Sequence, residues 1–177
     1  MKKYTLLYIL ALFTSLSAMA KVDVSNAKTE NMSNPLGLDT NKPRFSWQIT
    51  SVLFYVLQTA YEILVASSLD NLKADKGDLW NSGKVTSAEQ LWIAYAGTPL
   101  KSNQRAYWKV RIQTNKGKSE WSEPQEFGIG LLKESHWSGR WIGLERLMEG
   151  EQKGLHTRLA ARYLRKEFEL KDMQVVR

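Results

Sequence analysis

The chain has 177 residues, a formal net charge of +7 and no cysteine. The lack of cysteine excludes disulfide bonds, cysteine catalysis, thiolate metal sites and iron–sulfur clusters. Basic and acidic residues alternate closely, as in "RKEFELKD", and without a run of like charges the sequence does not favour nucleic-acid binding.

The first 20 residues have the pattern of a secretory signal peptide. Lys2 and Lys3 precede an apolar stretch at residues 4–13, and residues 18–20, Ala-Met-Ala, are the small residues before a cleavage site. The stretch is shorter than the roughly 20 apolar residues that cross a bilayer, so we expect no membrane span. The sequence predicts export to the periplasm or the outside of the cell.

Residues 21–130 consist of short alternating segments separated by turn residues, which is typical of a β-sandwich. The first strand is expected in "VDVSNAKTEN", before the Pro-, Gly- and Asn-rich turn "NPLGLDTNKP". In "RFSWQI", the residues Phe45, Trp47 and Ile49 share one face. This alternation predicts that they point into the core.

Three further strands are expected before residue 100. "AYEILVAS" places Tyr61, Ile63 and Val65 on one face, and "DLWNSGKV" reads as a short edge strand with a bend at Gly83. "LWIAYAG" is a third short strand, followed by a loop at Pro99.

Residues 107–127 read as two strands joined by a turn at residues 115–118, where Gly117 suits a positive φ. Pro124 belongs at the start of the last strand, because proline cannot donate to a β-ladder. The inward positions are Trp108, Val110, Ile112, Phe127 and Ile129. Seven strands fit between residues 21 and 130, and their apolar inventory is enough for a core without disulfides.

Residues 131–177 have too few apolar positions for an independent core. "LLKESHWSGRWIG" is expected to be a linker in which Trp137 and Trp141 pack. "YLRKEFEL" alternates and predicts a strand with Leu164, Phe168 and Leu170 on one face. We therefore expect a linker and the truncated start of a second β domain.

Several stretches, in this order, resemble the N-terminal region of bacterial α-L-rhamnosidases of glycoside hydrolase family 78. They are "ENMSNPLGLDTNKPRFSWQI", "QTAYEILVASS", "GDLWNSGKV", "YAGTPLKSNQRAYWKVRI" and "SEWSEPQEFGIGLL". The resemblance implies an all-β fold, a fibronectin type III or immunoglobulin-like sandwich. "WSGRWIG" and "RYLRKEFEL" resemble the start of the next, jelly-roll module, so an incomplete β segment would follow the sandwich.

The resemblance also implies an exported enzyme that removes terminal rhamnose from plant polysaccharides or glycosides by an inverting mechanism. Its acidic residues lie in a helical barrel without a counterpart in this sequence, so we assign no catalytic residue, cofactor site or metal site. The chain alone is expected to be inactive, with the later modules of the parent enzyme as its partners. The alternative is a free-standing carbohydrate-binding or protein-interaction module.

One segment departs from the family pattern, which has a polar turn between "SWQIT" and "QTAYEIL". Here residues Val52 to Leu57 read "VLFYVL" and are all apolar. A neighbouring domain could cover this loop, because exposed apolar patches usually mark contacts, or the sequence could be an altered gene product. In both cases we expect the isolated chain to bind hydrophobic dyes.

Four tryptophans are candidates for ligand contact. Trp47 and Trp108 fall at inward strand positions and are expected in the core. Trp121, in "SEWSEP", resembles the tryptophan–serine box of this sandwich class and is expected to stack near Arg111 by a cation–π contact. Trp92 lies on a short strand and is the candidate for carbohydrate contact.

The remaining candidate groups do not predict a site. His136 and His156 are the only histidines, whereas zinc takes three or four protein ligands, and we expect both on the surface. Glu167 and Glu169 have a spacing compatible with a glycosidase acid pair, but the polar face of any strand carries such pairs. "FGIGLL" is not followed by a helical pattern, so it does not indicate dinucleotide binding.

Overall fold

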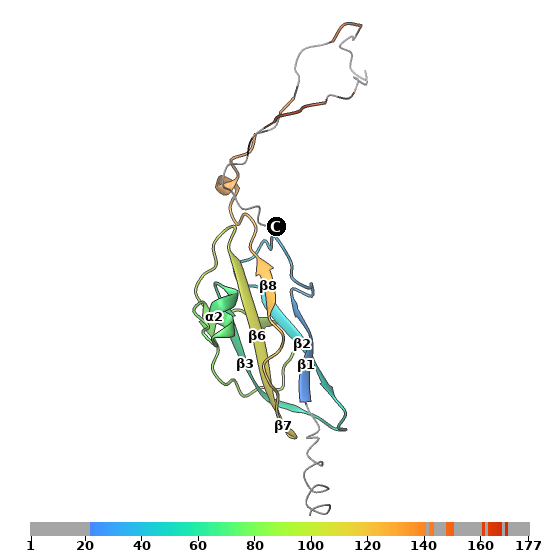
Figure 1. Cartoon of the computed structure of the whole chain (residues 1–177), viewed down its shortest axis with the longest axis vertical. Helices are drawn as coiled ribbons and strands as arrows, with labels where there is room; N and C mark the ends of the chain where they lie inside the picture. Colours follow the sequence, from blue (N-terminus) through green and yellow to red (C-terminus); the bar gives the residue numbers. More distant parts are fainter. Residues whose placement is uncertain are drawn as a thin grey trace, which may run out of the picture. The chain divides into compact units, whose positions relative to one another are not determined.

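The computed structural model describes residues 22–140, 142–143, 148–150, 161, 163–167 and 169. The chain divides into two compact units, Met1–Trp137 and Ser138–Arg177. The first unit holds a sandwich of two antiparallel sheets (Figure 1). One sheet has the strand order β1-β2-β5, and the other has the order β4-β3-β6-β7, with β8 also paired to β6. The predicted all-β sandwich is confirmed.

The described part of the chain contains eight strands and two short helices. In chain order they are β1 (Val22–Thr29), β2 (Arg44–Ser51), β3 (Gln58–Ala66), α2 (Leu69–Lys73), β4 (Trp80–Asn81), β5 (Ile93–Ala94), β6 (Arg105–Thr114), β7 (Gly117–Lys118), β8 (Gln125–Gly128) and the 3-10 helix η1 (Glu134–His136). The strand beyond the predicted seven is the two-residue β7, which continues the turn after β6. Gly117 has the expected positive φ, 130°.

The core lies between the two sheets, where the predicted inward residues meet. The ring centroid of Phe45 is 4.4 Å from that of Trp108 and 5.9 Å from that of Phe127. Trp47, on the same strand as Phe45, is also buried. All described members of this core cluster lie between Val22 and Leu132, so the sandwich closes on its own residues.

A smaller apolar cluster lies on the outer side of β3, where the helix α2 covers Leu64 and Ala66 with Leu72. The helix begins at Ser68, whose Oγ accepts a hydrogen bond from the N–H of Asn71 at 3.2 Å. A helix of five residues is too short to show a 3.6-residue period, so the hydrophobic pattern does not predict it.

The strand registers place two loops at opposite ends of the sandwich. Val22 pairs with Ser51 at one end, which is also where β2 passes into β3. At the other end, Gly128 of β8 pairs with Arg105, the first residue of β6. Because β6 has ten residues, the two ends are about 30 Å apart.

The described residues of the second unit form no strand. The prediction of a strand at residues 163–170 is therefore wrong for residues 163–167 and 169, while residues 168 and 170 lie outside the described residues. A strand needs a neighbour to satisfy its backbone N–H and C=O groups, and this part offers none among the described residues.

Two other predictions concern the tryptophans of the linker and the N-terminal signal peptide. Trp137 was expected to pack but is exposed, and Trp141 lies outside the described residues, as does the predicted signal peptide. Among the residues that the structure describes, no helix has the length and apolar character needed to cross a bilayer.

Candidate functional site

The tryptophan–serine segment after β7 is held against β6 by two serine side chains. The N–H of Ile112 donates to Ser119 Oγ at 2.9 Å, and the N–H of Val110 donates to Ser122 Oγ at 3.1 Å. The serine N–H groups return the bonds to the same residues' carbonyls, at 2.9 and 2.8 Å. These four bonds extend the sheet and fix Trp121 over the outer face of β6.

The outer face of β6 carries a cation–aromatic cluster around Trp121. The guanidinium carbon of Arg111 lies 4.3 Å from the ring centroid, and Lys109 Nζ lies 5.0 Å from it. The stacking predicted between Trp121 and Arg111 is therefore confirmed. Lys109 also pairs with Asp75, and this hydrogen bond lowers the pKa of the Asp75 carboxyl. Arg111 donates from Nε and Nη2 to Glu62 Oε2, at 2.8 and 2.6 Å.

Sequence reasoning missed Lys109, Asp75 and Glu62 as members of this cluster. Lys109 occupies an outward strand position, which predicts exposure, yet Trp121 and Asp75 bury it. The sequence contained one signal for the burial of Lys109, namely the predicted stacking of Trp121 near Arg111. An indole that lies over the outward face of a strand also covers the other cations of that face.

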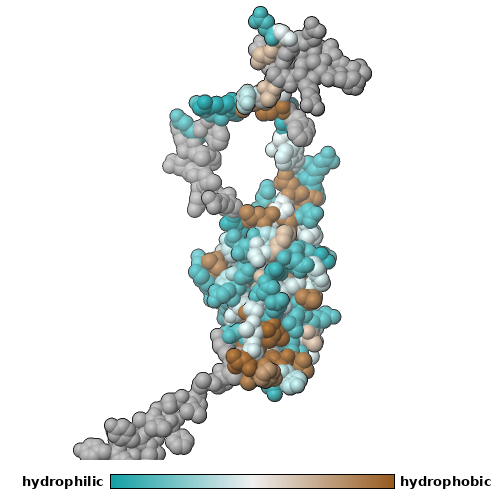
Figure 2. All heavy atoms as spheres, turned by 90° about the vertical axis from the view of Figure 1, so that its right-hand side faces the viewer, coloured by the Kyte–Doolittle hydropathy of each residue, from teal (hydrophilic) through white to brown (hydrophobic). Residues whose placement is uncertain are grey.

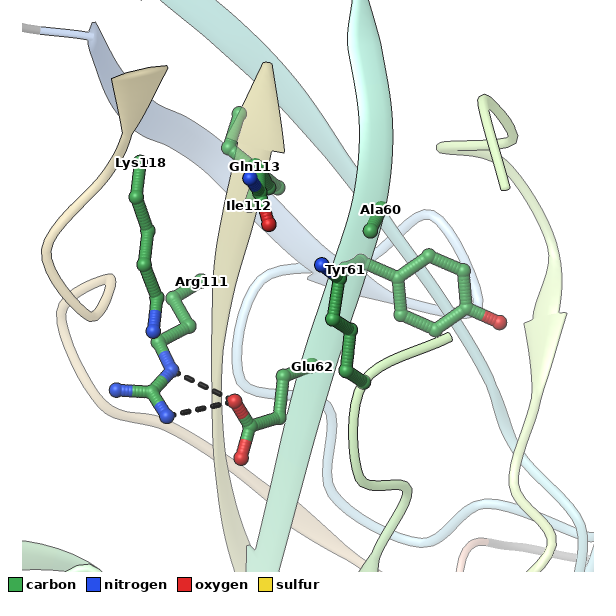
Figure 3. Close-up of a pocket in the computed structure, with 8 residues that line it drawn as sticks. Ala60, Tyr61, Glu62, Arg111, Ile112, Gln113 and Lys118 are labelled. Atoms are coloured by element: carbon green, nitrogen blue, oxygen red, sulfur yellow. Dashed lines mark hydrogen bonds and ion pairs between the residues drawn. The ribbon is translucent and has the colours of Figure 1, made fainter. Parts of the chain in front are cut away.

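Beside the cluster lies a small hollow of about 120 Å³ (Figure 3). Its lining residues are Ala60, Tyr61, Glu62, Lys84, Arg111, Ile112, Gln113 and Lys118. Ligand pockets usually enclose about 300–1,000 Å³, so this hollow is too small for a sugar chain. It has one carboxylate, Glu62, whereas glycosidases need two carboxyl groups flanking the bond.

A second hollow, of about 530 Å³, lies beside β5 and has no carboxylate in its lining. The lining residues are Asn41, Lys42, Ala94, Tyr95, Ala96, Gly97 and Pro99. Burial, with a contribution from Asp78, raises the pKa of Tyr95 to about 12. Its hydroxyl donates to the carbonyls of Thr98 and Leu79 at 2.7 and 3.2 Å, so Tyr95 is neutral at physiological pH and stabilises this loop.

Trp92, the candidate for carbohydrate contact, is 44% exposed. The guanidinium carbon of Arg44 lies 4.2 Å from its ring centroid and occupies one face of the ring. Arg44 Nη2 is also 2.6 Å from Glu30 Oε2, and this side-chain hydrogen bonding lowers the pKa of Glu30. A sugar stacking on Trp92 would therefore use the other face of the indole.

The other predicted candidates lie at the surface where they are described. His136 is exposed, with its Nδ1 2.6 Å from Ser102 Oγ, and His156 lies outside the described residues. Glu167 and Glu169 are exposed, and Glu167 pairs with Arg165. Within the described part of the chain, no three His, Cys, Asp or Glu side chains form a group that could hold a metal.

Residues 24–133 match the family profile of the Rha78A-like, N-terminal immunoglobulin domain. An α-L-rhamnosidase of Formosa agariphila is 40% identical over 176 residues, which cover 94% of this chain and 19% of that protein. The α-L-rhamnosidase of Streptomyces avermitilis, solved in complex with L-rhamnose, has a TM-score of 0.65 and 41% identity over 69% of this chain and 12% of that one.

The α-L-rhamnosidase from Dictyoglumus thermophilum gives the same TM-score, 0.65, with 38% identity over 68% of this chain and 14% of that one. The chain thus spans less than a fifth of the length of each of these relatives. It belongs to the family of Rha78A-like N-terminal immunoglobulin domains, as the N-terminal region of an α-L-rhamnosidase of glycoside hydrolase family 78.

Proposed function

We propose that this chain is a non-catalytic accessory segment of an exported enzyme that removes terminal L-rhamnose from glycosides. Its role is to pack against the later modules of that enzyme and to position them. The observation that carries the proposal is coverage: the chain aligns with 12–19% of the length of its α-L-rhamnosidase relatives, in an N-terminal immunoglobulin domain. The two hollows described above support it, since neither contains a pair of carboxylates.

The absence of catalysis is tested with the purified chain and a nitrophenyl α-L-rhamnoside. We expect no release of nitrophenol above the rate in buffer. Release that tracks the protein concentration would contradict the proposal. The gene beyond codon 177 provides the second test, because an open frame continuing into further modules supports a positioning role, whereas a stop codon favours a free-standing module.

Export is tested by expressing the full chain in a bacterium and sequencing the N-terminus of the periplasmic protein. The small residues at positions 18–20 support cleavage after Ala20, so that Lys21 becomes the first residue. Protein that stays in the cytoplasm and keeps Met1 would contradict export without affecting the assignment to the family.

The second candidate function is carbohydrate binding, and the observation that favours it is the partly exposed indole of Trp92. Aromatic rings that keep one open face are suited to stacking on sugars. Titration calorimetry with a rhamnose-rich polysaccharide tests this function. Binding that Trp92→Ala removes would support it, and the absence of binding by the unmodified chain would exclude it for that glycan.

A further inference from the structure

The loop between β2 and β3 concentrates exposed apolar side chains at one end of the sandwich. Val52, Phe54, Tyr55 and Leu57 are 81%, 84%, 89% and 65% exposed. Figure 2 shows hydrophobic side chains gathered at the lower end of the sandwich. Residues 51–58 connect β2 in one sheet to β3 in the other, and they lie against the β6–β7 hairpin turn at residues 114–118. We call these two segments together the hairpin tip.

Hydrogen bonds within the hairpin tip hold the loop in a defined conformation. The N–H of Leu57 donates to Asn115 Oδ1 at 2.9 Å, and the N–H of Asn115 donates to the Leu57 carbonyl at 3.0 Å. Asn115 Nδ2 donates to the carbonyl of Tyr55 at 3.0 Å. Val56 is partly buried and packs against the core. The loop is thus fixed from inside while its neighbouring side chains point to solvent.

The backbone at Tyr55 adopts a conformation that is unfavourable for a bulky side chain. Its φ is 58°, in the left-handed region that bulky residues rarely adopt. Glycine or asparagine would occupy this position with less strain. Backbone strain of this kind clusters at functional sites, and the same conformation occurs at Glu30, Asp75 and Trp92 outside the tip.

The first strand, which follows the predicted signal peptide (the leader), begins at this end of the sandwich. Val22 pairs with Ser51, so β1 starts at the hairpin tip. A single residue, Lys21, separates Val22 from the predicted cleavage position, and one residue spans at most about 3.6 Å. A leader that is inserted in a membrane and still attached to the folded sandwich would hold the hairpin tip close to the bilayer surface.

The charge of the hairpin tip fits the same surface. Residues 51–58 and 114–118 include Lys116 and Lys118, both exposed, and no aspartate or glutamate, while Asp23 at the adjoining start of β1 lies opposite Thr50. Lysine beside exposed aromatic and aliphatic side chains is the composition of segments that bind the interface of anionic membranes. A partner module that follows the sandwich in sequence fits less well, because the chain leaves β8 at the opposite end.

We infer that the hairpin tip is a membrane-surface contact that inserts Phe54 and Tyr55 into the headgroup region of an anionic bilayer. This inference rests on the export proposed above, and it assigns the domain a place at the membrane surface during or after export. The contact is peripheral, since the tip is a loop of six apolar residues and not a span.

The test uses residues 21–177, whose described core lies within Val22–Leu132. Co-sedimentation with vesicles of phosphatidylglycerol and phosphatidylethanolamine measures binding, with phosphatidylcholine vesicles as the uncharged comparison. We expect binding to the anionic vesicles and a loss of at least about ten-fold in the variant Phe54→Ser/Tyr55→Asn. The matched control Leu36→Ser/Leu91→Ser removes two exposed leucines outside the tip and should bind like the unmodified chain.

Insertion is measured separately, because the chain has no cysteine and accepts a single label. An environment-sensitive fluorophore on Phe54→Cys should shift to shorter wavelength with anionic vesicles, whereas the same label on Leu36→Cys should not. The inference is overturned if the unmodified chain does not bind, or if both serine variants lose binding equally. It is also overturned if the tip variant abolishes self-association instead, which would assign the tip to a second copy. The vesicles are added directly to the purified protein. The outcome of the binding test therefore does not depend on the outcome of the export test.

Discussion

The sandwich interior and the hairpin tip contain the same kinds of apolar side chain, but these are buried in the interior and exposed at the tip. Phe45 lies on β2 and Phe54 in the connection from β2 to β3, yet Phe45 is 0% exposed and Phe54 is 84% exposed. Phe45 alternates with polar neighbours on a paired strand, so the facing sheet covers it with Trp108 and Phe127. Phe54 lies in a loop that no described element covers. Strand pairing, and not apolar composition, therefore decides which of these side chains is buried.

Truncation of Trp108 should produce the largest difference between the two regions. Trp108→Ala leaves a cavity beside Phe45 and should cost about 3–5 kcal/mol of unfolding free energy. Phe54→Ala should change it by less than about 0.5 kcal/mol, because an exposed side chain makes few contacts. Urea denaturation of both variants measures the two values. Equal losses would mean that the hairpin tip is packed in the isolated protein.

The interior was largely predictable from the sequence because a half-buried strand repeats every two residues. The rule worked for Trp47, Trp108 and Phe127, which are buried as expected. It failed for Lys109, because the cover over that position comes from Trp121 and Asp75, which are distant in sequence. A pattern within one strand does not contain that information.

The lack of information on distant partners also explains why the strand predicted after Trp137 is wrong. Alternation in "YLRKEFEL" predicts a strand, but the described residues of this stretch are irregular. A period-two pattern states which face of a strand would be buried, and the strand itself forms only where another strand pairs with it. The hairpin tip is the opposite case, because it is more ordered than the sequence predicts. Its apolar run is visible in the sequence, whereas its hydrogen bonds to Asn115 are not.

A glycine-to-alanine substitution adds one methyl group and tests whether the backbone at that position is packed or open. A Cβ at Gly97 would lie 2.3 Å from the carbonyl oxygen of Leu79 and 2.4 Å from Trp80 Cβ. Gly97→Ala should therefore cost about 1–3 kcal/mol. Gly143 has no atom within 4 Å of the same position, so Gly143→Ala is the control with almost no effect. A neutral Gly97→Ala in urea denaturation would show that the loop beside β5 can move.

Acid titration probes an ion pair of intermediate exposure. Hydrogen bonding from Arg44 lowers the pKa of Glu30 below its ordinary value of 4.5. A carboxylate with a lowered pKa stabilises the fold above pH 4.5, and this contribution is lost as the pH falls through the folded pKa. Because Arg44 is about half exposed, the effect should stay below about 1 kcal/mol.

Glu30→Gln should remove this part of the pH dependence, while Glu120→Gln, at an exposed position, should leave it intact. The measurement is the urea midpoint of each variant at pH 7 and pH 3. Parallel losses on acidification in the unmodified chain and in Glu30→Gln would assign the acid sensitivity to other carboxylates.

The smallest effect is expected at Tyr55, and it has the opposite sign. Asparagine tolerates the φ of 58° better than tyrosine, so Tyr55→Asn should raise the unfolding free energy by up to about 1 kcal/mol. Tyr163→Asn is the matched control, because Tyr163 is exposed without a positive φ. A loss of stability in Tyr55→Asn would show that the ring packs in the isolated protein. A gain, together with weaker vesicle binding, would mean that the hairpin tip keeps its aromatic side chain at the expense of stability because the membrane surface uses it.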